Sequence, residues 1–120
     1  MITAVNNGTA YQPYAASGVY LKPVMPSHLD TLIINYNGVL VGSGADAIYA
    51  HIGFGRNWTY IEDVKMQKKM SSFELSFDMP IPADCINLCF RDSADNWDNN
   101  SGRNYTYTIE LDAHYGGINV

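Results

Sequence analysis

The sequence predicts an all-β protein, an antiparallel β-sandwich of the immunoglobulin-like kind, and three observations lead to this prediction. Apolar and polar residues alternate at period two, Gly, Pro and Asn separate the alternating segments, and no stretch has a useful helical period. The 120 residues, 47% of them hydrophobic, suffice for one core but not two. We therefore expect one sandwich over residues 18–112, preceded by a partly ordered extension at 1–17 and followed by a tail at 113–120.

The first expected strands lie at residues 19–24 and 29–36, the second of which is rich in β-branched residues. An Asn37-Gly38 step follows, and this dipeptide between two apolar runs is a strong hairpin signal. We therefore expect a hairpin that joins residues 32–34 to a strand at 39–41.

Residues 48–54 have the pattern of a half-buried strand, with apolar side chains at every second position. Successive side chains of a strand point to opposite faces, so the apolar set faces the core and His51 faces outward, toward the loop that carries Trp58. Further strands are expected at 73–79, 86–90 and 105–109. The basic run 65–69 is expected to form a solvated turn.

The composition excludes several classes of partner. A net charge of -5 and a pI near 4.8 argue against nucleic acid, because phosphates require a basic surface. No segment resembles a membrane span or a signal peptide, so we expect no membrane partner. A complete chain would then be cytoplasmic, whereas a fragment of a secreted enzyme would be extracellular. With only 16% charged residues, the surface suits neutral polar ligands.

The two cysteines, Cys85 and Cys89, fall four residues apart on one expected strand. Their side chains would share a face about 13 Å apart, too far for a disulfide. The spacing differs from that of zinc sites, so we expect buried free thiols and no cofactor.

Both tryptophans occur in polar, turn-like segments, which is unusual for so large an apolar side chain. Trp97 is surrounded by Asp and Asn and is expected to face solvent or a ligand. Trp58 follows Arg56-Asn57 and has the alternative of anchoring its loop on the core, while His51 has the alternative of an ordinary surface imidazole. A flat indole beside amides and carboxylates is the combination that binds sugar rings.

The acidic run 92–100 also raises the possibility of calcium. Asp92, Asp95 and Asp98 are spaced by three, whereas the EF-hand pattern requires oxygen ligands at alternate positions followed by Gly. A structural calcium therefore stays an alternative to a self-capping or sugar-bonding turn, which we favour.

Several motifs together resemble a known family. They are His51-Ile-Gly-Phe-Gly-Arg-Asn-Trp58, the Met66-Gln67-Lys68 step, the strand Ile86-Asn-Leu-Cys-Phe90-Arg-Asp92, and Trp97-Asp98-Asn99-Asn100. The stretch from about Val19 to Leu111 resembles the starch-binding modules of carbohydrate-binding family 25 and the related family 53. It departs from the pattern at Leu88-Cys89 and Arg91, where the family usually has Phe-Val and a small polar residue.

The resemblance implies a sandwich that binds α-1,4-glucans (starch, glycogen or maltooligosaccharides) without catalysis. Motif by motif, it implies an aromatic platform of His51, Trp58 and Trp97. It further implies polar contacts from Asn99, Asn100 and Lys68. A glycoside hydrolase or another carbohydrate-active domain is the kind of linked partner that such modules accompany.

Two other classes of function are weighed against this interpretation. Glycoside hydrolysis needs two carboxylates that flank the bond, and a shallow surface near Asp95 and Asp98 offers no means of raising the pKa of one of them. We therefore expect no enzyme. A β-sandwich that binds another protein is the alternative, because exposed aromatic residues and nine tyrosines also suit a protein interface.

Overall fold

The computed structural model describes residues 17–111, in which nine strands and one short helix are found. The elements, in chain order, are β2 (Val19–Lys22), β3 (Thr31–Tyr36), α1 (Val39–Gly42), β4 (Ile48–Phe54), β5 (Thr59–Lys65), β6 (Gln67–Lys68), β7 (Phe73–Asp78), β8 (Cys85–Asp92), β9 (Trp97–Asp98) and β10 (Tyr105–Thr108). The expected extension at 1–17, apart from its last residue, and the tail at 113–120 lie outside the described residues.

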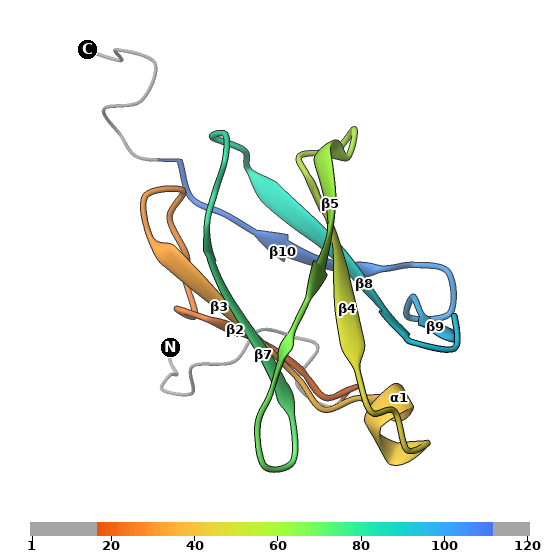
Figure 1. Cartoon of the computed structure of the whole chain (residues 1–120). Helices are drawn as coiled ribbons and strands as arrows, with labels where there is room; N and C mark the ends of the chain where they lie inside the picture. Colours follow the sequence, from red (N-terminus) through yellow and green to blue (C-terminus); the bar gives the residue numbers. More distant parts are fainter. Residues whose placement is uncertain (1–16, 112–120) are drawn as a thin grey trace, which may run out of the picture.

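Two antiparallel sheets face each other (Figure 1). One has the order β10-β8-β4-β5, with β9 also paired to β8, and the other has the order β2-β3-β7-β6. The chain crosses between the sheets after β3, β5 and β7, so each sheet combines strands that are distant in sequence. This arrangement is that of immunoglobulin-like sandwiches and confirms the predicted fold class.

The core lies between the sheets and consists of the alternate side chains of each strand. The buried apolar residues are Val19, Leu21, Leu32, Ile34, Tyr36, Leu40, Ile48, Ala50, Ile52, Phe54, Met66, Phe73, Ile86, Leu88, Phe90, Tyr105, Tyr107 and Ile109. Tyr36 of one sheet stacks on Phe90 of the other, with ring centroids 4.3 Å apart. Burial of these side chains drives the pairing of the two sheets.

Strand β4 has the predicted bounds and the predicted parity. Ile48, Ala50, Ile52 and Phe54 are buried, whereas His51 is only partly buried on the outer face. Strand β8 confirms that Cys85 and Cys89 share a strand, and both are free thiols. Cys89 is buried as expected, whereas Cys85 is only partly buried.

The predicted hairpin at Asn37-Gly38 is wrong. Residues 39–41 belong to helix α1 instead of a strand, with Leu40 turned into the core. The reason is that β3 already pairs with β2 along one edge and with β7 along the other, so this apolar run has no free edge to join.

The predicted solvated turn at 65–69 is also wrong, because this run contains the end of β5 and the whole of β6. Met66 between them is buried, and its amide donates to the carbonyl of Ile48. Within residues 17–111, no helix is long and apolar enough to span a membrane.

Candidate functional site

Three aromatic side chains meet on the outer face of the sheet that contains β4 and β8. The His51 ring lies between the two indoles, with its centroid 5.8 Å from that of Trp58 and 5.7 Å from that of Trp97. The His51 and Trp58 planes meet at 35°, and the His51 and Trp97 planes meet at 85°. The structure therefore brings together the three rings singled out in the sequence, as a bent surface instead of a flat one.

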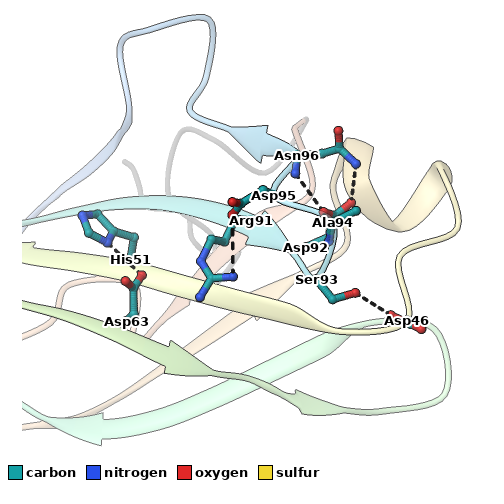
Figure 2. Close-up of polar contacts among 9 residues, drawn as sticks. All are labelled: Asp46, His51, Asp63, Arg91, Asp92, Ser93, Ala94, Asp95 and Asn96. Atoms are coloured by element: carbon teal, nitrogen blue, oxygen red, sulfur yellow. Dashed lines mark hydrogen bonds and ion pairs between the residues drawn. The ribbon is translucent and has the colours of Figure 1, made fainter.

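His51 is held by a partner on the neighbouring strand. It lies opposite Asp63 in the β4–β5 register, and its Nδ1 is 2.8 Å from Oδ1 of Asp63 (Figure 2). Because an ionised carboxylate only accepts hydrogen bonds, Nδ1 is the donor of this bond. The ring orientation thus depends on a residue of β5.

Trp58 packs on the outer face of β4 over Gly53. A Cβ built on Gly53 would lie 2.7 Å from Cδ2 of the indole, so only a glycine leaves room for it. Trp58 also has a left-handed backbone, with φ of 54°, a conformation that non-glycine residues seldom adopt. Asn87 on β8 holds the loop that precedes Trp58, because its Nδ2 donates to the Gly55 carbonyl at 2.8 Å.

Trp97 is 46% exposed and belongs to β9, a two-residue strand on the edge of β8. It lies opposite Arg91 in the β8–β9 register. The Arg91 guanidinium lies over the Tyr49 ring at 4.2 Å from its centroid, a cation–π arrangement, and reaches 4.0 Å from Oδ1 of Asp95. Arg91 therefore links strand β4 to the turn that leads into Trp97.

The turn before Trp97 is capped by Asp92, as Figure 2 shows. One carboxylate oxygen accepts the backbone N–H groups of Ala94 and Asn96, and the other accepts from Nδ2 of Asn96. These bonds, with the one from the Asn96 side chain first, hold the pKa of Asp92 below its usual range. The turn is thus self-capping, one of the alternatives predicted for this run.

Asp98 is buried on the opposite side of β9 from Trp97. Its two oxygens accept from the hydroxyls of Tyr36 and Tyr105 at 2.7 and 2.8 Å. Burial raises the pKa of Tyr36, so this phenol remains a proton donor. Asp98 therefore fixes β9 to the core instead of facing a ligand.

The three predicted polar residues lie in different parts of the fold. Asn99 follows β9 directly, and its Oδ1 accepts from the amide of Gly102. Asn100 donates from Nδ2 to the Asn104 carbonyl and lines an open groove with Ser101. Lys68 lies on β6 of the other sheet, opposite Phe73.

Cys89 lies opposite His51 in the β4–β8 register, on the same outer face, yet it is buried. Burial, with smaller effects of Asp63 and Asp98, raises the pKa of the Cys89 thiol to about 11. Among the described residues, no group of three or more His, Cys, Asp or Glu side chains is placed to hold a metal ion.

Sequence reasoning missed the residues that position the rings, namely Gly53, Asp63, Asn87 and Arg91. Asp63 lies on β5, whose residues are mostly exposed on both faces and so lack the alternation that marks a strand. The signal that could have found it is the turn Gly55-Arg56-Asn57, since a hairpin there places Asp63 beside His51.

Comparisons with known proteins give two similarities. Residues 32–88, slightly less than half of the chain, match the starch/carbohydrate-binding module of family 53. This stretch includes His51, Trp58 and Lys68 but not Trp97. An alpha-amylase from Clostridium acetobutylicum is 29% identical over 105 residues, which cover 86% of this chain and 13% of the amylase. The chain thus spans about 13% of the length of this curated relative.

These similarities agree with the resemblance to starch-binding modules that the sequence motifs indicate. The matching family is family 53, one of the two that the motifs resemble, and membership of family 25 stays a prediction.

Proposed function

We propose that the chain is a non-catalytic module that binds α-1,4-glucans on the platform formed by His51, Trp58 and Trp97. The single observation that carries the proposal is the meeting of these three rings, from two different strands and a loop, on one outer sheet face. The similarity of residues 32–88 to a starch/carbohydrate-binding module supports it.

The angles between the rings favour a curved ligand. An α-1,4-glucan is a helical ribbon in which each glucose has an apolar C–H face, and successive faces turn along the chain. Ring planes at 35° and 85° to His51 can follow such a turn, whereas the flat ribbon of a β-1,4-glucan would need coplanar rings. Starch, glycogen and maltooligosaccharides are the ligands of this class.

The expected affinity is modest. By analogy with aromatic pairs, a stacking contact contributes about 0.5–1.5 kcal/mol beyond area burial. Hydrogen bonds to hydroxyls add about 1 kcal/mol net each. Two or three stacked sugars and a few such bonds correspond to a Kd between about 1 μM and 1 mM.

The polar contacts to sugar hydroxyls are proposed to come from groups next to the rings. The Oδ1 atom of Asn99 accepts from the loop amide of Gly102, and its Nδ2 group, next to β9, can donate to a sugar hydroxyl. Asn100 is a weaker candidate since its amide donates to the loop, and Lys68 would need a glucan that extends to the other sheet.

A linked glycoside hydrolase is the partner we propose, because the curated relative is an amylase far longer than this chain. The module would hold the polymer near the enzyme and take no part in bond cleavage.

Affinity electrophoresis tests the proposal. The chain should migrate more slowly in a native gel that contains soluble starch than in the same gel without it, relative to a non-binding standard. Equal migration in both gels would count against it.

The alternative is a module that binds another protein. Exposed Tyr60 and Ile61, 58% and 56% exposed, lie in the strand that follows Trp58 and favour this alternative. This alternative predicts that the tryptophan fluorescence changes on addition of a protein partner and does not change on addition of a glucan.

A further inference from the structure

We infer that Asp63 is a positioning residue of the glucan site, which fixes His51 in the form that accepts a hydrogen bond from a sugar hydroxyl. The inference rests on the proposed function and assigns a role to a residue outside the aromatic platform.

The first step concerns the proton on His51. Asp63 lies directly across the β4–β5 register, and its Oδ1 is 2.8 Å from Nδ1 of His51. A neutral imidazole has one N–H donor and one acceptor nitrogen, and the carboxylate can only accept. The neutral ring must therefore carry its proton on Nδ1, and Nε2 is left with a lone pair.

The second step concerns where Nε2 points. In an imidazole, Nδ1 is next to the carbon attached to the side-chain stem, and Nε2 is at the far end of the ring. His51 projects from the outer face of β4, and its side chain is 26% exposed. In the described part of the chain, Asp63 is the hydrogen-bond partner found for this ring, and Nε2 has none.

The third step concerns what lies around Nε2. The two indoles flank the His51 ring at 5.8 and 5.7 Å, so a sugar stacked on either indole brings its hydroxyls to the histidine. Glucose hydroxyls both donate and accept. A fixed acceptor at Nε2 therefore selects a hydroxyl that donates, and it does so without a cost for reorienting the ring.

The same geometry gives Asp63 no direct role in stacking. Asp63 lies on β5, the edge strand of this sheet, so no further strand lies on its other side. Its side chain is 46% exposed. A carboxylate has no flat apolar face on which a sugar could stack, and the double variant described below tests whether the effect of Asp63 passes through His51.

The test measures maltoheptaose binding by titration calorimetry and compares four variants with the wild type. Asp63→Ala removes the carboxylate, and Glu62→Ala is the matched control, because Glu62 is the adjacent acidic residue and faces the other side of β5. We expect Asp63→Ala to weaken binding about fivefold, as for the loss of one hydrogen bond, and Glu62→Ala to change it less than about twofold.

The third variant is His51→Ala, and the fourth combines it with Asp63→Ala. If Asp63 acts through His51, adding Asp63→Ala to His51→Ala should weaken binding by less than about twofold. An equal fivefold loss in both backgrounds would overturn the positioning role.

Nitrogen NMR of the free protein reports which nitrogen of His51 carries the proton. This property would not change if Asp63 only stabilised the fold. The neutral His51 ring should be protonated on Nδ1 in the wild type and in Glu62→Ala, and should lose this preference in Asp63→Ala. Protonation of wild-type His51 on Nε2, or wild-type affinity of Asp63→Ala, would overturn the inference while the proposed function stands. If the wild type fails to bind maltoheptaose, the proposed function and this inference both fall.

Discussion

Gly53 lies directly beneath the indole of Trp58, at the point where a side chain on β4 would occupy the space of the ring. A Cβ at Gly53 would come within 2.7 Å of Cδ2, which is too close for two carbons, and within 3.0 Å of the Trp58 Cα, which is a tight contact. The absence of a side chain at position 53 therefore sets the position of one ring of the platform.

Gly53→Ala should displace Trp58 and weaken glucan binding. We expect the affinity for maltoheptaose to fall about three- to tenfold, the loss of one stacking contact. Gly42→Ala is the control, because a Cβ at Gly42 meets nothing within 4 Å. Unchanged affinity of Gly53→Ala would show that Trp58 does not contact the glucan.

Trp97→Ala should abolish retardation in gels containing soluble starch without unfolding the domain. The side chain is 46% exposed, so its loss should change the free energy of unfolding by less than about 1 kcal/mol. Met70→Ala removes another exposed apolar side chain, in the turn after β6, and should migrate like the wild type. If starch retards Trp97→Ala as much as the wild type, the platform hypothesis is wrong.

Tyr36→Phe should destabilise the fold because it leaves buried groups without partners. The Tyr36 hydroxyl donates to Oδ2 of Asp98 and accepts from the amide of Leu40. We expect a loss of about 1–3 kcal/mol in the free energy of unfolding, measured with urea. Tyr49→Phe, on the outer face, should cost less than about 0.5 kcal/mol. Equal stabilities would show that the bonds to Asp98 do not hold β9 to the core.

The stability that Asp92 gives to the turn before Trp97 should not change with pH until the pH becomes acidic. The pKa of Asp92 is lower in the folded chain than in the unfolded chain, where it is about 3.9. Its contribution to stability is therefore complete above about pH 4 and is lost as the pH falls through the folded value.

Carboxyl NMR should accordingly give Asp92 a titration midpoint below about 3.9. Asp92→Asn, which lacks one acceptor oxygen, should loosen the turn and weaken maltoheptaose binding already at pH 7. A midpoint at or above the unfolded value would contradict the capping role.

The fold class and the three rings could be predicted from the sequence because their signals are local. The alternation in residues 48–54 fixes the outward face of His51, and the polar setting of Trp97 marks it as exposed. The strand pairings are not local. The register that sets Asp63 beside His51, and the two occupied edges of β3 that turn residues 39–41 into α1, depend on contacts between distant segments.

The polar half of the site was harder to predict for a related reason. An Asp or Asn next to a tryptophan gives the same sequence pattern whether its side chain binds a sugar or another part of the chain. Asp92 and Asp98 accept hydrogen bonds from other residues of the chain, and these bonds depend on the tertiary structure.

The central claim, that the bent aromatic platform binds α-1,4-glucans, is tested most directly by titration of the intrinsic tryptophan fluorescence. Trp58 and Trp97 are the only tryptophans, and both flank His51, so any sugar on the platform must change the signal. The account predicts a saturable change with maltoheptaose and none with cellohexaose. No response to maltoheptaose, or an equal response to both sugars, would contradict it.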